Sequence, residues 1–489
     1  MIHWRKFDYK SLDDMRSDIT ELDVHLPVSA NLEILAQPIQ VHGKTVKNRI
    51  AIQPLECFDA SLEGTPSDLT FRRYRRLSAG GSGMIWFESV STTPRSQTSR
   101  WQARINEANL PVFQRLLYEI RDSASDGKPP YVIVQITNSG RNSRLDGDGK
   151  FSDGIPQNIL VENPYLPKPR AVVMTDDELD AAQDEYVKTA MLMKEAGFDA
   201  IDIRCCHGYL ISETLSAFTR ENSKYGGSFE NRTRFLLEII DRVNKEVGIP
   251  LGMRYNATDM LPYPYGWGMK TDGSMTPDFT EPLKLAEMLI QRGVTLLNIS
   301  MGRSHATHIV LPYNRHSVFP KEHQLVAMAF YHNLAAIFKK HFKDTVVMAG
   351  AKSWARQYSA NRAAGGIESG MYDMAGWGRM ALAYPDFAND IVKNGEMVEK
   401  KCCITCNSCF NLIGTAASTG SPVGCPIKDK EIYAPIHKKY VGNFVRPHIS
   451  QQSVKLWGMS ENPPAKGDEV PADSPLLNGV KTVHEFLQN

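Results

Sequence analysis

Four cysteines near the C-terminal end of the chain have the spacing of metal ligands. Cys403, Cys406 and Cys409 lie in the run C-I-T-C-N-S-C, Cys425 follows in G-C-P, and Cys402 lies beside the first. Thiolates grouped so closely are soft ligands for an iron–sulfur cluster or a zinc ion. The spacing fits either group, and also thiols without a metal. We favour a [4Fe–4S] cluster held by Cys403, Cys406, Cys409 and Cys425, because such clusters often take three ligands from one turn and a fourth from downstream.

A second run whose side chains could take part in a reaction is His207-Gly208-Tyr209. A tyrosine hydroxyl can protonate a carbanion once hydride has reached the neighbouring carbon. A histidine beside it can hold a carbonyl oxygen while negative charge develops there. The alternative is that both side chains only pack in a loop between a strand and a helix.

Composition limits the class of protein. The 489 residues are 42% hydrophobic and 23% charged, as in soluble globular proteins. A net charge of +1 gives no reason to expect nucleic acid or an anionic membrane as partner. The start of the chain, Met1–Lys6, is not followed by the apolar stretch of a secretory signal, and no apolar run reaches the roughly 20 residues that span a bilayer. We therefore expect a cytoplasmic protein whose cysteines are reduced thiols rather than disulfides.

Short apolar runs alternate with helical patterns and predict an α/β protein. The expected strands are near-continuous hydrophobic runs, as in parallel strands covered on both faces: Arg49–Pro54, Gly83–Ser91, Tyr131–Thr137, Asp199–Cys205, Pro250–Asn256, Thr295–Gly302, Thr345–Gly350 and Met371–Arg379. The expected helices include Met174–Ala196, with a capping box at Thr175-Asp176-Asp177-Glu178, Phe229–Val247 and Lys321–Phe342. This order predicts a (β/α)8 TIM barrel with a C-terminal cysteine-cluster extension. A doubly wound sheet is the rival, but Gly266-Trp267-Gly268 lacks the third glycine of a dinucleotide fingerprint and does not follow a strand.

The predicted domains follow from where this alternation begins and ends. We expect an N-terminal extension over residues 1–32, a barrel over 33–395, a cluster segment over 396–430 and a tail over 431–489. Residues 426–489 contain much Pro, Lys, Asn and Gly and no long periodic segment, so we expect a wrapping tail or a partner arm.

Such barrels place their chemistry at the C-terminal ends of the strands. Polar residues and glycines at those ends predict a site for an anionic, hydrogen-bonding cofactor, formed by Pro54, Leu55, Ser89, Gln135, Arg254, Gly350, Gly378 and Arg379. A phosphate would lie near Gly350 and Gly378, with Arg379 as a charged fork. Gln135 would bind the pyrimidine edge of a flavin, and Arg254 would stabilise negative charge near N1 of the reduced flavin.

Several motifs in this order resemble the old yellow enzyme family of FMN-dependent ene-reductases. More narrowly, the chain resembles its iron–sulfur branch, the 2,4-dienoyl-CoA reductases and related NADH:flavin oxidoreductases. The motifs are Lys47-Asn48-Arg49-Ile50 with Ala51-Ile52-Gln53-Pro54, Gln135-Ile136 through Gly140-Arg141, His207-Gly208-Tyr209-Leu210, Tyr225-Gly226-Gly227-Ser228, Glu230-Asn231-Arg232, Gly378-Arg379 and Pro385-Asp386. The resemblance covers residues 33–430 and implies an FMN barrel followed by an iron–sulfur cluster.

The chain departs from this family pattern at several positions. Arg204 stands where relatives often carry His, which implies that it binds a substrate carboxylate or carbonyl oxygen, unless it pairs with Asp202 or Glu213. Asn138 replaces another His. The cysteine spacing is C-x2-C-x2-C rather than C-x2-C-x3-C, so either Cys402 or Cys403 is the first ligand. No dinucleotide fingerprint follows Cys425. We therefore expect electrons to come from NAD(P)H bound over the flavin or from a separate electron-donor protein.

The resemblance implies reduction of the C=C bond of an α,β-unsaturated carbonyl or carboxyl compound. Hydride would come from flavin N5 and the proton from Tyr209, with His207 and Arg204 polarising the carbonyl. Three alternatives are oxidative demethylation of an amine, as in relatives of trimethylamine dehydrogenase, an electron-transfer subunit without its own substrate, and a zinc-stabilised barrel of the aldolase kind. Arg204 would repel a cationic amine, which disfavours the first of them. The sequence leaves open the alkene, the electron donor and whether the chain forms a homo-oligomer.

Overall fold

The structure is a computed structural model of the chain. It describes residues 7–143, 158–160, 162–166, 172–304, 306–307, 322–443, 450–460, 468 and 474–488. Residues 1–6, on which part of the expectation about a secretory signal rests, lie outside the described residues, as do Lys321 and parts of the tail.

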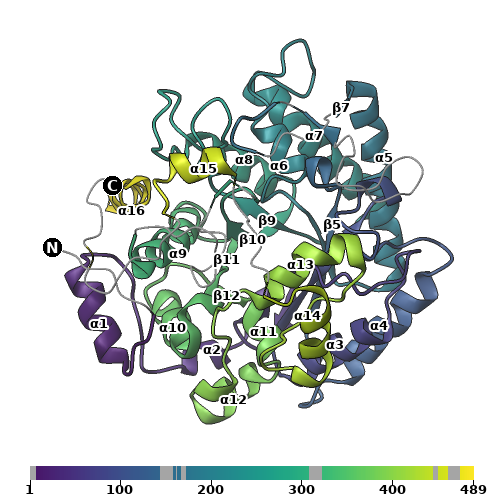
Figure 1. The fold of residues 1–489 in the computed structure, drawn as a ribbon. Helices are drawn as coiled ribbons and strands as arrows, with labels where there is room; N and C mark the ends of the chain where they lie inside the picture. Colours follow the sequence, from purple (N-terminus) through teal and green to yellow (C-terminus); the bar gives the residue numbers. More distant parts are fainter. Residues whose placement is uncertain are drawn as a thin grey trace.

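Eight parallel strands close into a barrel, as predicted (Figure 1). They are β3 (Ile50–Ile52), β4 (Met84–Ser91), β5 (Tyr131–Thr137), β8 (Ala200–Ile203), β9 (Leu251–Asn256), β10 (Val294–Ser300), β11 (Val346–Ala349) and β12 (Met374–Trp377). Each strand pairs with its neighbour in the chain order, and β12 returns to pair with β3. Each lies within its predicted range, except that β10 begins one residue earlier. The (β/α)8 fold class is therefore confirmed.

Helices surround the barrel. Those between and after the strands are α3 (Asp68–Ala79), α4 (Leu110–Asp122), α5 (Asp176–Ala196), α6 (Leu210–Leu215), α7 (Phe229–Arg242), α8 (Thr280–Gln291), α9 (Gln324–His341), α10 (Ser359–Glu368), α11 (Arg379–Ala383) and α12 (Phe387–Asn394). The three predicted helices correspond to α5, to α7 with its continuation Val243–Val247, and to α9. The predicted capping box is formed, since Thr175 Oγ1 accepts from the Glu178 N–H at 3.1 Å and Glu178 accepts from the Thr175 N–H at 2.8 Å.

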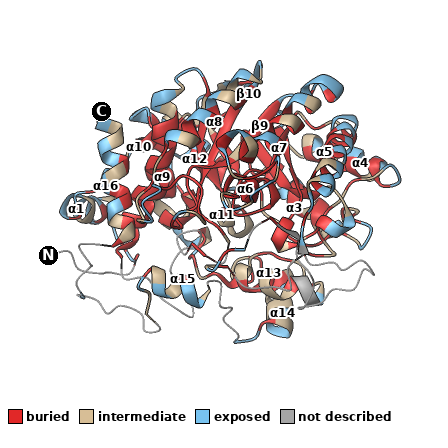
Figure 2. Cartoon of the chain, turned by 90° about the horizontal axis from the view of Figure 1, so that it is seen from above, coloured by how far each residue is buried: buried red, intermediate tan, exposed pale blue. Residues whose placement is uncertain are grey.

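Burial explains the hydrophobic runs. Nearly every strand residue is buried, because the helices cover the outside and side chains fill the inside (Figure 2). Met84, Trp86, Ile133, Leu296 and Met348 pack together in one cluster. The hairpin of β1 (Ile39–Val41) and β2 (Lys44–Val46) adds Val41 and Val46 to that cluster. Polar side chains therefore gather at the opposite, C-terminal ends of the strands.

The segments outside the barrel also contain helices. The N-terminal extension contains α1 (Leu12–Glu21), followed by α2 (Glu33–Ala36), and the cluster segment contains α13 (Ser408–Thr419). The tail contains α14 (Lys430–Tyr440), α15 (Gln451–Leu456) and α16 (Pro475–Gln488). The prediction that the tail has no long periodic segment was wrong. Leu476, Val480 and Val483 are buried on one face of α16, which packs against α9. Among the described residues, none of the helices is long and apolar enough to cross a bilayer.

Candidate active site

Two hydrogen-bonded side chains connect β3 to β10 at the C-terminal ends of the barrel strands, which form the mouth of the barrel. Gln53 Nε2 donates to Asn298 Oδ1 at 3.0 Å, and Asn298 Nδ2 donates to Gln53 Oε1 at 2.9 Å. Gly376 makes room for this pair, since a Cβ atom there would lie 2.0 Å from Gln53 Nε2. Gly350 and Gly378 lie at the ends of the neighbouring strands β11 and β12, and a Cβ atom at Gly378 would lie 3.4 Å from Leu55. The predicted residues Leu55, Gly350 and Gly378 are thus brought to one edge of the mouth.

A buried carboxylate organises the opposite edge. Asp202 Oδ2 accepts from Gln135 Nε2 at 2.7 Å and from Trp86 Nε1 at 2.9 Å, while Oδ1 accepts from the Arg254 N–H at 2.9 Å. Burial raises the pKa of Asp202 to about 6. Gln135 also accepts from the Ser89 hydroxyl. The predicted residues Ser89, Gln135 and Arg254 therefore meet around Asp202, a residue that sequence reasoning considered only as a partner for Arg204.

Arg254 has a buried donor atom that a bound anion could satisfy. Its Nε atom is buried and has no hydrogen-bond partner among the described residues. An unsatisfied buried donor is costly, so a bound acceptor at this position would stabilise the site. A flavin offers such acceptors along its pyrimidine edge, and the residues present fit that group.

Arg204 forms contacts that the sequence did not predict. Its Nη1 atom donates to Glu56, which follows β3, and to Ser89 Oγ at 2.8 Å. Its guanidinium carbon lies 3.2 Å from the centre of the Tyr209 ring. The alternative of a salt bridge to an acid is therefore present, although the acid is Glu56 and neither of the two named as examples, Asp202 and Glu213. The sequence feature that indicates Glu56 is its position directly after a strand.

Tyr209 and His207 both reach the mouth from the loop after β8. Burial raises the pKa of Tyr209 to about 12, so its hydroxyl keeps its proton at neutral pH. His207 Nε2 lies 2.7 Å from Ser300 Oγ, and burial, aided by Arg254 and Arg204, lowers the pKa of His207 well below its usual range. The loop needs a glycine between them, because Gly208 has φ +76° and a Cβ atom there would lie 2.8 Å from Arg303. Sequence reasoning missed Ser300, a small polar residue at the C-terminal end of β10.

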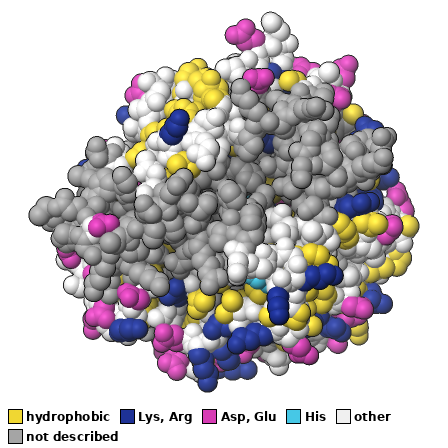
Figure 3. Space-filling model, in the orientation of Figure 1, with side chains coloured by type: hydrophobic (Ala, Val, Ile, Leu, Met, Phe, Trp, Pro, Cys, Tyr) yellow, Lys and Arg dark blue, Asp and Glu magenta, His cyan; other side chains and the backbone are white. Residues whose placement is uncertain are grey.

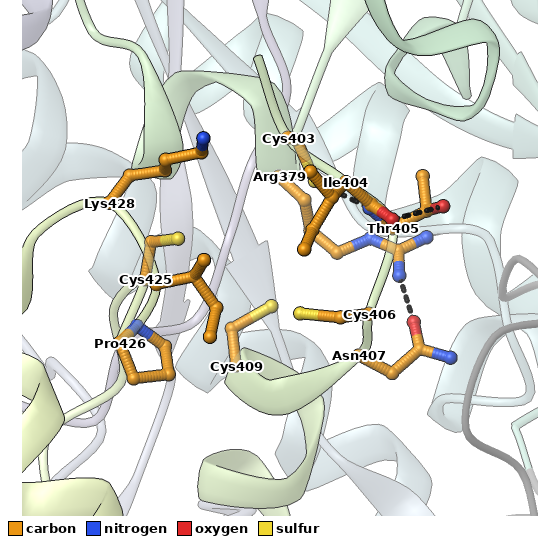
Figure 4. Close-up of a pocket in the computed structure, with 11 residues that line it drawn as sticks. Arg379, Cys403, Ile404, Thr405, Cys406, Asn407, Cys409, Cys425, Pro426 and Lys428 are labelled. Atoms are coloured by element: carbon orange, nitrogen blue, oxygen red, sulfur yellow. Dashed lines mark hydrogen bonds between the residues drawn. The ribbon is translucent and has the colours of Figure 1, made fainter. Parts of the chain in front are cut away.

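The predicted cysteines line one pocket (Figure 4). Cys403, Cys406, Cys409 and Cys425 face it, together with Arg379 and Lys428. Cys402 is not among the lining residues, and its Sγ atom lies 3.5 Å from the Val398 carbonyl oxygen. Of the two adjacent cysteines, the one that faces the pocket is therefore Cys403.

The backbone turns the thiols inward. Thr405 and Asn407, on either side of Cys406, adopt left-handed conformations with φ of 55° and 58°. Cys403 Sγ accepts from the Thr405 N–H at 3.4 Å. Burial raises the pKa of Cys425 to about 11, against the effect of hydrogen bonds from the backbone of Ile427 and Lys428. Across the described part of the chain, no three His, Cys, Asp or Glu side chains are arranged to hold a metal ion. A set of four soft donors around a pocket beside two cationic side chains suits an anionic iron–sulfur cluster.

Arg379 lies between the two sites. It follows Gly378 at the end of β12, but its Nη1 atom donates to Asn407 Oδ1 in the cysteine segment. Figure 4 shows its guanidinium beside Thr405 and Asn407. The predicted role as a phosphate fork stays a prediction, and in this structure the side chain links the barrel to the cysteine segment.

The sequence model of the NADH:flavin oxidoreductase / NADH oxidase family matches residues 34–397. The chain belongs to this family. It is 31% identical over 272 residues to the NADPH dehydrogenase of Bacillus pumilus (strain SAFR-032), which covers 55% of this chain and 73% of that protein. Identity to the NADPH dehydrogenase of Bacillus subtilis (strain 168) is 30% over 283 residues, covering 57% of this chain and 76% of that protein. The family and these relatives make the chain a flavin-dependent oxidoreductase of the old yellow enzyme type, and support binding of FMN and NAD(P)H.

Solved structures share the fold at lower identity. A 2-naphthoyl-CoA reductase in complex with 2-naphthoyl-CoA has a TM-score of 0.65 at 22% identity, and the match covers 84% of this chain. Histamine dehydrogenase from Rhizobium sp. 4-9 has a TM-score of 0.62 at 20% identity, over 82% of this chain. The old yellow enzyme homologue from Zymomonas mobilis has a TM-score of 0.55 at 20% identity, over 75% of this chain and 94% of its own. The chain spans only 58% of the first structure and 53% of the second.

Proposed function

We propose that the protein is an FMN- and [4Fe–4S]-dependent ene-reductase, which reduces the C=C bond of an α,β-unsaturated carbonyl or carboxyl compound. The observation that carries the proposal is the buried Tyr209 at the mouth of the barrel, with Arg204 against its ring and His207 two residues away, held 2.7 Å from Ser300 Oγ. When bound, FMN would supply hydride from N5 to the β-carbon of the substrate. Tyr209 donates its proton to the α-carbon, which completes the addition of two hydrogens across the double bond.

The remaining residues divide into cofactor and substrate contacts. Gln135, Ser89 and Arg254 would contact the flavin ring, and backbone N–H groups near Gly350 and Gly378 would hold its phosphate, beside Pro54 and Leu55. His207 would donate a hydrogen bond to the substrate carbonyl oxygen as an imidazole rather than an imidazolium. Arg204 would act on the substrate mainly as a hydrogen-bond donor, because its pairing with Glu56 offsets its charge.

Cys403, Cys406, Cys409 and Cys425 would hold the cluster. Support comes from their shared pocket and from the two cationic side chains beside it. A [4Fe–4S] cluster with four thiolate ligands carries net negative charge, which Arg379 and Lys428 would offset.

A second candidate function is amine oxidation. The sequence argument against it was repulsion of a cationic substrate by Arg204. That argument is weaker now, because Glu56 compensates the charge of Arg204, and a structural neighbour is a histamine dehydrogenase. An electron-transfer subunit without its own substrate is the third candidate.

Anaerobic half-reactions distinguish the three. Reduced holoenzyme is mixed with cyclic enones and enoyl thioesters, and oxidised holoenzyme with primary and tertiary amines, while flavin absorbance is followed by stopped flow. We expect reoxidation by an unsaturated carbonyl compound, slowed about 10²-fold or more in Tyr209→Phe while reduction by the donor is nearly unchanged. Reduction by amines alone would establish the second function. Equal loss in both half-reactions of Tyr209→Phe would mean that the tyrosine is structural.

A further inference from the structure

Glu56 joins the two functional side chains of the mouth. One carboxylate oxygen accepts from Arg204 Nη1, and the other lies 3.5 Å from the Tyr209 hydroxyl oxygen. Arg204 lies flat against the Tyr209 ring, with its guanidinium carbon 3.2 Å from the ring centre. The three groups come from the loop after β3, from the end of β8 and from the loop before α6.

The charges in this triad oppose one another. A guanidinium against a phenol ring favours the phenolate and so lowers the pKa of the tyrosine, whereas a carboxylate near its hydroxyl raises it. The groups that face Tyr209 are Arg204, Glu56, Cys206 and Thr98. Glu56 is the acidic group among them that is directly paired with the arginine. Its side chain is 13% exposed, so it also connects the tyrosine to the rim of the site.

We propose that Glu56 is a positioning residue that orients the Tyr209 hydroxyl and offsets the charge of Arg204 against its ring, and so adds to the effect of burial in keeping the proton on Tyr209 for the substrate. This inference rests on the proposed role of Tyr209 as proton donor. Without the carboxylate, the guanidinium of Arg204 would lie uncompensated against the ring and would draw the proton off the phenol at lower pH.

The substitution Glu56→Gln tests this relation because it keeps the size and polarity of the side chain and removes its charge. We expect the alkaline limb of the pH profile for alkene reduction to move down by at least about one pH unit, the usual scale for the loss of a neighbouring charge. The double variant Glu56→Gln/Arg204→Met removes both charges while a long side chain still covers the ring. In that variant the limb should return toward its wild-type position.

A second measurement is independent of turnover. The tyrosinate absorbance of each protein is titrated and compared with that of its Tyr209→Phe counterpart, so that the difference reports Tyr209 alone. The apparent pKa from this difference should be lower in Glu56→Gln than in wild type and in Glu56→Asp. Glu281→Gln, which breaks the pair that Glu281 forms with Arg232 at 2.7 Å elsewhere, is the matched control and should leave Tyr209 unchanged.

The outcomes separate this inference from the proposed function. If Tyr209→Phe retains full alkene reduction, the proposed function fails, whatever Glu56 does. If Tyr209→Phe is slow but the limb and the tyrosinate titration are the same in Glu56→Gln as in wild type, the inference about Glu56 is overturned. A lower melting temperature of Glu56→Gln with an unmoved Tyr209 titration would likewise overturn it, because Glu56 would then only brace Arg204.

Discussion

The Nε2 atom of His207 lies 2.7 Å from Ser300 Oγ, which in turn lies 2.9 Å from the Tyr331 hydroxyl oxygen. This relay fixes the imidazole ring and occupies one of its nitrogens. Burial and the neighbouring cations Arg254 and Arg204 hold the pKa of His207 well below its usual range. The ring is therefore neutral where an ordinary histidine would titrate.

We therefore predict that His207 contributes no limb to the pH profile of alkene reduction between about pH 5.5 and 8. His207→Asn should lower kcat, because the shorter amide donor cannot reach the carbonyl oxygen in the same geometry, and should leave the shape of the profile unchanged in this range. The measurement is kcat/KM against pH for both proteins. An acid limb present in wild type and absent in His207→Asn would show that the imidazole titrates after all.

A second prediction concerns the iron content of the cysteine pocket, with the neighbouring Cys402 as the control. Anaerobically purified wild type should contain about four irons and about one FMN per chain. Cys403→Ser and Cys409→Ser should lose most of the iron, because both residues line the pocket. Cys402→Ser, one residue away and directed at Val398, should retain it. Iron, zinc and flavin are measured together by metal analysis and absorbance. Stoichiometric zinc without iron would refute the cluster assignment.

A third prediction concerns stability. Burial raises the pKa of Glu185 from 4.5 to about 7. A carboxyl group with a raised pKa favours the folded state while it is protonated, and that contribution is lost as the pH rises through the folded-state pKa. Glu185→Gln should therefore be more stable than wild type at pH 8, by about 1–2 kcal/mol after allowance for partial exposure, and equal to it near pH 4, below the ordinary glutamate pKa of 4.5.

Thermal or urea unfolding at several pH values measures this difference. Glu107→Gln is the control, because Glu107 is exposed and pairs with Lys188 at 2.8 Å on the surface. A Glu185→Gln variant whose stability parallels that of wild type at every pH would mean that Glu185 is ionised in the folded protein.

The fold was readable from the sequence because parallel strands covered on both faces need continuous hydrophobic runs, and all eight strands have them. The tail helix α16 was missed because the tail was judged by its Pro, Lys and Asn content. The buried face of this helix consists of only a few residues, among them Leu476, Val480 and Val483. Their role depends on contact with α9, which the sequence alone does not show.

The site was predicted in its residue types but not in its pairings. Strand ends are found from periodicity, so Gln135, Arg254 and Tyr209 were expected at the mouth. Which acid faces Arg204 depends on the register between β3 and β8, which are not neighbours in the barrel. Asp202 was not assigned to the site, because a polar residue inside a strand gives no sign of facing the mouth until the barrel closes. Ser300 is the last residue of β10, but the predicted strand ran on to Gly302, so Ser300 was not recognised as a strand-end residue.

The last prediction is that electrons can enter through the cluster. Leu55 connects the two sites. It lies next to Gly378 at the mouth. Leu55 and Cys409 both pack against a group of buried hydrophobic side chains that includes Cys57, Phe58 and Leu412.

The rim of the cysteine pocket reaches the surface, since Ile404 is 40% exposed. Lys400, Lys438 and Lys439 are exposed in and beside the cysteine segment, where they would contact acidic groups of an electron-donor protein. On this face, Figure 3 shows Lys and Arg side chains interspersed with Asp and Glu side chains.

The test compares flavin reduction by NADH, by NADPH and by a low-potential donor protein such as reduced ferredoxin, in wild type, Cys409→Ser and Cys402→Ser. If the cluster relays electrons, Cys409→Ser should lose at least about ten-fold in rate with the protein donor, a loss of about 1.4 kcal/mol of transition-state stabilisation, and keep its rate with the nicotinamide that serves wild type. Cys402→Ser should match wild type with every donor. If the cluster only fastens the segment to the barrel, Cys409→Ser will have a lower melting temperature and will lose rate equally with all donors, because metal ligation also stabilises folds. An unchanged rate with the protein donor, in a folded Cys409→Ser protein without iron, would show that the cluster does not relay these electrons.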